Sequence, residues 1–245
     1  MKLEPFYPVQ LVCTNNKHEY KIGDSPDLHP SVTGILNVLN KPFLVPWAAK
    51  EAANKIKGYL KAHAVNRCLT AEEIDQLVEA GRKEHEVKKE AAADLGTRAH
   101  KAIDQIIRGE KPEVDDDIKP CVDAFLDWYR NANIRIALGD TKIGSMAHGY
   151  GGSLDAMGFQ GDLPVILDWK TSNAISDTYA YQVAAYGQAF METYGVQAVD
   201  YYILRLGKTK PEFEVRKLKN PYLSFRGFLH ALSLYRHEKE PKWAA

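Results

Sequence analysis

Three charged side chains stand where two predicted strands meet: Asp155, Asp168 and Lys170. A tight turn centred on Gly161-Asp162 would join these strands as a hairpin, because a Gly-x pair suits a two-residue loop. In that register the numbers of paired residues sum to 323, so Asp155 stands opposite Asp168. Their β-carbons are then about 4.5–5.5 Å apart, and Lys170 shares the same face two residues further on. The spacing predicts two carboxylates and one ammonium group on one face of a sheet.

This arrangement suits hydrolysis of a phosphodiester bond. Two facing carboxylates repel each other unless a cation lies between them, and their hard oxygen atoms suit Mg²⁺ or Mn²⁺. A water bound to such an ion has a lowered pKa and can attack phosphorus, while the ion neutralises charge on the phosphoryl oxygens. The Lys170 ammonium group could orient that water or stabilise the transition state.

The Asp-x-Lys triplet by itself says little, because Asp and Lys are common residues and the chain contains three such triplets. The other two are Asp117 with Lys119 and Asp140 with Lys142. Only Asp168 follows a buried-strand pattern, residues 165–167, and only Asp168 has a partner carboxylate across a predicted turn. Without that partner, Asp168 would be interpreted as a solvated strand residue.

Three further polar residues lie at helical spacing, and each has two interpretations. His100 shares a predicted helix face with Ile103 and Ile107, where a lone histidine is more often a hydrogen-bonded core residue than a ligand. Gln182 and Tyr186 lie four residues apart on a later helix, where they could hold a nucleic-acid backbone or stack a base. A core tyrosine with a surface glutamine explains that spacing equally well.

The elements that position these residues are mainly helical in the first half of the chain. Helices are expected over residues 47–64, after Pro46, and from a Thr70/Glu73 capping box to about Ala93. Another helix is expected to begin near Thr97, after Gly96. An acidic loop then leads into a helix with apolar residues Val122, Phe125, Leu126 and Tyr129.

Strands are expected in the second half. They cover residues 143–157, 165–170, 201–204 and 213–218, with a helix over 179–194 that Gly195 ends and a last amphipathic helix. The fold class is mixed α/β. The absence of repeats and long linkers predicts one domain over residues 1–245, with a helical half at about 31–135, a core at about 140–220 and a helix at about 221–240.

Composition excludes several classes of protein. Hydrophobic residues make up 45% and charged residues 26%, which excludes collagen-like, disordered and membrane-spanning chains. Lys with Arg and Asp with Glu both number 32, so any site for a polyanion must be local. Cys13, Cys68 and Cys121 are too few and too scattered for a disulfide framework. No export signal is found, so a reducing cytoplasm, bacterial or of a phage-infected host, is expected.

Four segments together resemble the ordered motifs of the PD-(D/E)XK nuclease superfamily, in its RecB-type branch. They are Gly96-Thr97-Arg98-Ala99-His100, Gly151-Gly152-Ser153-Leu154-Asp155, Ile166-Leu167-Asp168-Trp169-Lys170-Thr171-Ser172 and Gln182-Val183-Ala184-Ala185-Tyr186. Three early elements are similar to those of phage-type and mitochondrial genome maintenance exonucleases: Ser31-Val32-Thr33, Ile35-Leu36 and Trp47-Ala48-Ala49. The resemblance covers about residues 31–190.

The resemblance implies a restriction-endonuclease-like core, a central mixed sheet flanked by helices. It implies metal ligation by Asp155 and Asp168, with His100 as a ligand or close neighbour and the Trp169 carbonyl as a further ligand. Lys170 would be the catalytic lysine. The residues implied to contact DNA or support the site are Gln182, Tyr186, Ser31, Thr33 and Arg98.

The expected cofactors and partners depend in part on two motifs that the sequence does not contain. The expected cofactor is Mg²⁺ or Mn²⁺, and no iron–sulfur cluster is expected because four cysteine ligands are missing. No phosphate-binding G-x-x-x-x-G-K-[ST] motif is present, so a helicase, recombinase or single-strand-binding protein would be a partner in trans. No membrane partner is expected.

DNA, single-stranded or with a free end, is the expected substrate. From Tyr201 onward the sequence contains ten basic residues and four glutamates. These basic residues, with those of the early helices, are expected to border a groove for the phosphate backbone. A merely solvated surface fits the same residues equally well. The principal interpretation is a metal-dependent DNA exonuclease. Its alternatives are a structure-specific endonuclease with the same centre, and a nuclease-inactive nucleic-acid-binding or recombination module.

Overall fold

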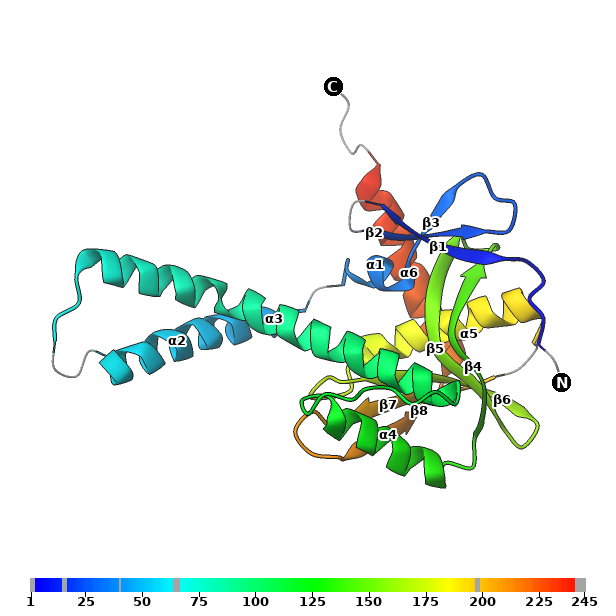
Figure 1. Cartoon of the computed structure of the whole chain (residues 1–245). Coiled ribbons are helices and arrows are strands. Elements are labelled where there is room, and N and C mark those ends of the chain that lie inside the picture. Colours follow the sequence, from blue (N-terminus) through cyan, green and yellow to red (C-terminus); the bar gives the residue numbers. More distant parts are fainter. Residues whose placement is uncertain (1–2, 15–16, 40, 64–66, 197–198, 241–245) are drawn as a thin grey trace. The chain divides into compact units, whose positions relative to one another are not determined.

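The elements of the chain are seen in a computed structural model that describes residues 3–14, 17–39, 41–63, 67–196 and 199–240 (Figure 1). Two compact units make up the chain. Unit 1 comprises Met1–Leu39 with Arg98–Ala245, and unit 2 comprises Asn40–Thr97. The expected single nuclease domain, with its helical half, core and last helix, stays a prediction.

Strands and helices follow one another in a mixed order, which confirms the α/β class. The strands are β1 (Val9–Thr14), β2 (Lys17–Ile22), β3 (Leu28–Pro30), β4 (Arg135–Ser145), β5 (Tyr150–Gln160), β6 (Leu163–Lys170), β7 (Asp200–Leu206) and β8 (Phe213–Lys217). The helices are α1 (Val32–Leu36), α2 (Leu44–His63), α3 (Ala71–Ile107), α4 (Lys119–Asn131), α5 (Asp177–Tyr194) and α6 (Pro221–Lys239). No helix among the described residues has the length and apolar character that crossing a membrane requires.

A five-stranded sheet in the order β4-β5-β6-β7-β8 is the centre of unit 1. Its neighbours pair antiparallel except β6 and β7, which run parallel. A parallel pair needs a long crossover connection, and α5 supplies it between β6 and β7. The mixed sheet flanked by helices agrees with the fold that the motifs implied.

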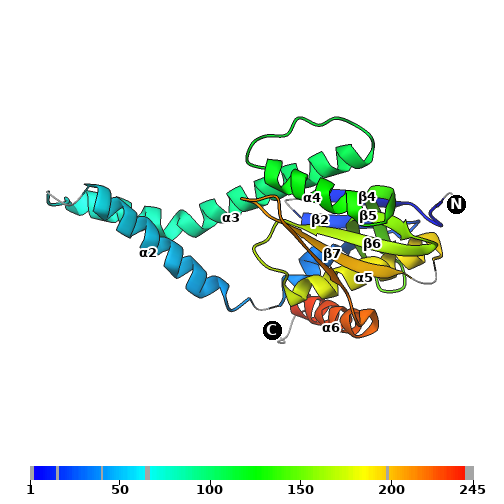
Figure 2. The ribbon, with the colours of Figure 1, turned by 90° about the horizontal axis from the view of Figure 1, so that it is seen from below.

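The two faces of this sheet are covered by different helices (Figure 2). Ile166 of β6 belongs to a buried cluster with Ile35 of α1, Phe190 of α5 and Phe228 of α6. Trp169 instead packs on α4, with its ring 5.2 Å from that of Phe125 and 5.7 Å from that of Trp128. Because successive strand residues alternate between faces, Asp168 lies on the α5 side of β6.

The first three strands form a small antiparallel sheet that the sequence analysis did not predict. Only Tyr20 and Ile22 of β2 are buried, so alternation is too short to mark a strand. The Tyr20 and Ile22 side chains pack into space left by two glycines of the large sheet. A β-carbon at Gly151 would lie 2.4 Å from Tyr20, and one at Gly144 would lie 2.7 Å from Ile22.

The expected strand over residues 143–157 is wrong as a single element. It belongs to β4 and β5, which pair antiparallel and are joined through Gly149. Gly149 has a φ of +63°, which favours glycine, and its N–H donates to the Ser145 carbonyl at 2.8 Å. Other glycines lie on both sides of this turn, at positions 144, 151 and 152, so the sequence does not single out Gly149 as the turn residue.

Helix α3 begins where the sequence predicted but does not end where it predicted. The Thr70/Glu73 capping box is present: Glu73 N–H donates to Thr70 Oγ1 at 3.2 Å, and Thr70 N–H donates to Glu73 Oε2 at 2.9 Å. The break expected at Gly96 is wrong, because α3 continues through it to Ile107. Glycine inside a helix costs only about 1 kcal/mol relative to alanine, which neighbouring residues can offset.

Later elements agree with their predictions. Helix α5 ends at Gly195, whose left-handed φ of +69° lets its N–H donate to the Met191 carbonyl. Strands β7 and β8 and helix α6 lie where expected. The three cysteines are free thiols, of which Cys121 is buried.

Two helical glycines give a matched test of packing. A β-carbon at Gly187 of α5 would lie 1.9 Å from Tyr201 Cε1, whereas one at Gly58 of α2 would meet nothing within 4 Å. Gly187→Ala is therefore expected to lower the free energy of unfolding by about 1–3 kcal/mol. Gly58→Ala is expected to raise it by about 0.5–1 kcal/mol. Urea denaturation measures both, and equal effects of the two variants would contradict the packing.

Candidate active site

The register of the β5–β6 hairpin is the one that the sequence predicted. Ala156 pairs with Leu167, and Gln160 pairs with Leu163, so the numbers of paired residues sum to 323. Gly161 occupies the first position of the turn with a φ of +62°, which glycine adopts without strain. One step beyond the Ala156 pair, the same register places Asp155 opposite Asp168.

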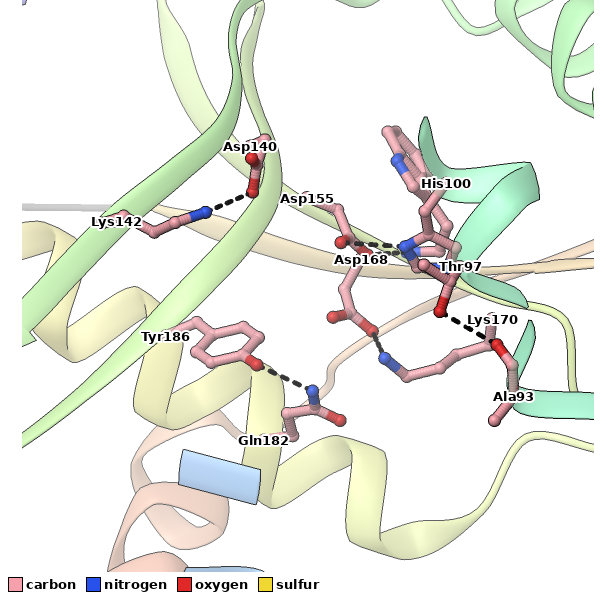
Figure 3. Close-up of polar contacts among 11 residues, drawn as sticks. Ala93, Thr97, His100, Asp140, Lys142, Asp155, Asp168, Lys170, Gln182 and Tyr186 are labelled. Atoms are coloured by element: carbon pink, nitrogen blue, oxygen red, sulfur yellow. Dashed lines mark hydrogen bonds and ion pairs between the residues drawn. The ribbon is translucent and has the colours of Figure 1, made fainter. Parts of the chain in front are cut away.

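Asp155 is held by two donors from different elements (Figure 3). The backbone N–H of Trp169, on the facing strand, donates to Asp155 Oδ2 at 2.7 Å. His100 Nδ1, from α3, lies 3.1 Å from Asp155 Oδ1. These two contacts fix the carboxylate, and its side chain is 20% exposed. His100 therefore contacts Asp155, and its role beside a metal ion stays a prediction.

Asp168 is almost wholly buried, with a side chain only 2% exposed. Its Oδ2 atom forms an ion pair with Lys170 Nζ, and among the described residues it has no partner with hydrogen-bond geometry. The Lys170 ammonium group also lies 5.0 Å from the centre of the Tyr179 ring, a cation–π distance. Tyr179 lies in the first turn of α5, and no local sequence pattern predicts this contact because it depends on how α5 packs.

The charges of His100 and Asp155 stabilise each other. Burial lowers the pKa of His100, but the charge of Asp155 and the hydrogen bond to it raise the pKa more, so the net shift is upward. Burial raises the pKa of Asp155, but His100, Lys170 and the Trp169 N–H lower it below its ordinary value. Both side chains therefore favour their charged forms.

Asp168 and Lys170 differ in how burial affects them. Burial raises the pKa of Asp168 to about 6, and the neighbouring charge of Asp155 adds to this shift while Lys170 opposes it. Burial lowers the pKa of Lys170, but Asp168 and Asp155 raise it more, so its net shift is upward. At neutral pH the site holds two carboxylates. The Lys170 ammonium group contacts Asp168, and the His100 ring contacts Asp155.

The donor set fits a hard divalent ion with water in its coordination shell. Asp155 and Asp168 bring carboxylate oxygens together, and among the described residues the buried Asp168 Oδ2 atom is in contact with the Lys170 ammonium group alone. Within the described ranges, no group of three or more His, Cys, Asp or Glu side chains is arranged around a common point. Such a site suits Mg²⁺, which is held by one or two carboxylates and keeps several waters. It does not suit a structural Zn²⁺, which needs four protein ligands.

Gln182 and Tyr186 lie beside the site but are buried. Gln182 Nε2 donates to Tyr186 Oη at 2.9 Å, and the two residues are 8% and 4% exposed. Burial raises the pKa of Tyr186 well above its ordinary value, with a further contribution from Asp168. A ring so covered offers no face for a base to stack on, so these contacts favour the supporting role over direct DNA contact.

The remaining residues implied by the resemblance lie elsewhere on unit 1. Ser31 caps α1 by accepting a bond from Gly34 N–H at 3.0 Å, and Thr33 is exposed. Arg98 forms ion pairs with Asp115 and Asp117 of the acidic loop. A DNA contact by Arg98 would compete with these carboxylates, and the roles of all three residues stay predictions.

The other Asp-x-Lys triplets do not reproduce the site. Lys142 Nζ pairs with Asp140 Oδ1 at 2.6 Å, but the Asp140 side chain is 53% exposed. Asp117 binds Arg98 rather than Lys119. Burial and a facing carboxylate distinguish Asp168, as the hairpin register predicted.

Part of the basic excess near the carboxyl end is neutralised within the protein. Arg205 and Arg216 both contact Glu214, and Lys217 contacts Asp200. Lys242 lies outside the described residues. The predicted phosphate groove along these strands stays a prediction.

No protein-family model and no curated protein matches this chain. Among solved structures it is similar to the alkaline exonuclease LHK-Exo from Laribacter hongkongensis, with a TM-score of 0.37 and 14% identity, covering 58% of this chain and 78% of that one. It is also similar to an inferred exonuclease from Eubacterium rectale, with a TM-score of 0.43 and 13% identity, covering 79% and 81% of the two chains. Similarities this distant carry no argument for function, which must come from the site.

The His100–Asp155 contact predicts a measurable pKa change. In the metal-free protein, Asp155→Asn removes the charge that raises the pKa of His100 and leaves burial as the main influence. The pKa of His100 is expected to fall from above 6.5 to below it, so the ring loses its proton at lower pH. Histidine NMR signals followed through a pH titration measure this.

Asp140→Asn is the matched control, because it removes an exposed carboxylate that His100 does not contact. An unchanged or raised pKa of His100 in Asp155→Asn, or an equal fall in both variants, would contradict the contact.

Proposed function

We propose that this chain is a Mg²⁺- or Mn²⁺-dependent DNA exonuclease that hydrolyses phosphodiester bonds in single strands or at duplex ends. The observation that carries the proposal is that Asp155 and Asp168, next to the last pair of the β5–β6 hairpin, lie close enough to raise the pKa of Asp168, with Lys170 in contact with Asp168. Two buried carboxylates and an ammonium group in contact are unfavourable for folding alone, because each charge loses its hydration. A catalytic role accounts for keeping them together.

Asp155 and Asp168 would hold the metal ion, and the resemblance adds the Trp169 carbonyl as a further ligand and His100 as a ligand or close neighbour. When bound, such an ion lowers the pKa of a coordinated water and neutralises charge on the phosphoryl oxygens. His100 and the Trp169 N–H keep Asp155 in place by the hydrogen bonds they make to its two oxygens. These contacts would set the position of the carboxylate before substrate binds.

Lys170 would act on the reacting phosphate. Its ammonium group is held between Asp168 and the Tyr179 ring, so its position is fixed by two contacts. From there it would orient the attacking water or stabilise the negative charge that develops on the phosphoryl oxygens. Gln182 and Tyr186, which hydrogen-bond to each other, would pack beside the carboxylates and support their position.

DNA is proposed as the substrate, and replication, recombination or repair as the process, because the ordered motifs resemble those of the RecB-type nucleases. The proposal is supported by the contacts that join the motifs containing His100, Asp155 and Lys170 (Figure 3). An endonuclease with the same centre is the alternative, and a nuclease-inactive nucleic-acid-binding or recombination module is the other.

Cleavage should depend on the two central residues. Asp168→Asn and Lys170→Met are each expected to lower the rate of hydrolysis of end-labelled DNA by about a thousandfold or more, because each removes a charge that acts in the transition state. Digestion of single- and double-stranded substrates with Mg²⁺, Mn²⁺ or EDTA measures this, and EDTA should stop cleavage.

Asp140→Asn is the control, since it changes the exposed carboxylate of another Asp-x-Lys triplet and should keep the wild-type rate. Full activity in either site variant would remove the assignment. A folded wild-type chain that cuts no substrate with either metal would instead support the inactive module.

The need for a free end separates the exonuclease from the endonuclease. On circular single-stranded DNA the rate of cleavage is expected to be at least about a hundredfold below that on the same sequence made linear, which corresponds to about 2.7 kcal/mol. Gel analysis of both substrates with Mg²⁺ measures the ratio. Equal rates on the circle and the linear strand would support the endonuclease.

A further inference from the structure

One face of helix α2, in unit 2, carries basic side chains without nearby carboxylates. Lys50, Asn54, Lys57 and Lys61 are all exposed. At 100° per residue their positions fall within about 60° of one another around the helix axis, so they form one stripe. We call the surface formed by these four residues the α2 stripe.

The other side of α2 is held against α3. Lys55 pairs with Glu84 at 3.1 Å, and Glu51 pairs with Lys88. The Trp47 ring meets the His85 ring edge-on, with 6.4 Å between their centres. Glu51, the one acidic residue of α2, is therefore directed toward α3 and leaves the α2 stripe without a negative charge of its own helix.

The lysines of the stripe keep their charge uncompensated. Among the described residues, no carboxylate lies within ion-pair distance of Lys50, Lys57 or Lys61. Arg82 and Lys83 of α3 differ, because both pair with Glu79. The α2 stripe thus holds three positive charges and no acidic residue, although the basic and acidic residues of unit 2 nearly balance.

We infer that the α2 stripe binds the phosphate backbone of single-stranded DNA. At a rise of 1.5 Å per residue, Lys57 and Lys61 are about 6 Å apart and Lys50 is about 10.5 Å from Lys57 along the axis. Ammonium groups in such a row can each bind a different phosphate of one flexible strand, because a single strand can adjust the spacing of its phosphates to the row. Choosing DNA among polyanions rests on the proposed function.

An anionic membrane is a poorer partner for this face. A helix that lies in a membrane surface buries its apolar side among lipids. Ala52 and Ile56 of α2 pack against Gly81 of α3, and the exposed apolar residues of α2, Leu44, Val45 and Leu60, lie outside the stripe. The stripe therefore offers charge alone, which suits a phosphate backbone in water.

Binding to the full chain is measured with a fluorescent oligothymidylate of 20 nucleotides. EDTA is added to remove divalent ions and so prevent cleavage. Lys50→Gln, Lys57→Gln and Lys61→Gln are combined in one variant. The expected affinity is about tenfold or more below wild type at low salt, and the slope of log K against log salt falls by about 2, because each phosphate contact contributes about 0.7. Circular dichroism checks that the variant folds.

The matched control combines Arg82→Gln, Lys83→Gln and Lys89→Gln, which removes the same charge from α3. It should lower the affinity by less than half as much as the stripe variant. Equal losses in both variants, or no loss in the stripe variant, would overturn the inference. So would stripe-dependent binding to phosphatidylserine vesicles without binding to the oligonucleotide.

Failure of the nuclease proposal gives a different result. If Asp168→Asn keeps full cleavage while the stripe variant loses binding in EDTA, the stripe stands and the catalytic assignment falls. If Asp168→Asn abolishes cleavage while the stripe variant binds as tightly as wild type, the catalytic centre stands and the stripe falls.

Discussion

The structure of unit 1 is organised around two carboxylates kept close together out of water. Asp155 and Asp168 face each other across one hairpin, and their repulsion contributes to the raised pKa of Asp168. Three groups offset that repulsion: the His100 ring, the Trp169 N–H and the Lys170 ammonium. Each comes from a fixed element, so the site depends on the hairpin register and on α3. A shift of one residue in that register would place Asp155 on the opposite face from Asp168.

Close packing under the site keeps these elements in place. A β-carbon at Gly152, three residues before Asp155, would lie 2.5 Å from the Tyr186 ring. The missing side chain lets α5 approach β5, and the approach brings Gln182 and Tyr186 beneath the carboxylates. The aromatic contacts of Trp169 fix the other face of β6 against α4. Ile166 and Trp169 thus anchor β6 to helices on the two faces of the sheet.

The sequence was informative where local rules decide the structure. The Gly161-Asp162 turn set the hairpin register, the Thr70/Glu73 pair set a helix start and Gly195 set a helix end. It was uninformative where tertiary packing decides. Strands β1–β3 owe their place to Tyr20 and Ile22 filling space beside two glycines, and no local pattern records that. Likewise, only the packing of α5 places Tyr179 over Lys170. The two carboxylates and the lysine were predictable, while much of what surrounds them was not.

Whether the paired carboxylates bind a divalent ion can be measured without any substrate. Electron paramagnetic resonance of free Mn²⁺ reports how much of the ion the protein takes up. The account predicts that the wild-type chain and Asp140→Asn lower the free Mn²⁺ signal equally, while the combined Asp155→Asn and Asp168→Asn variant, still folded, leaves it unchanged. Equal uptake of Mn²⁺ by the combined variant and the wild type would contradict the account at its centre.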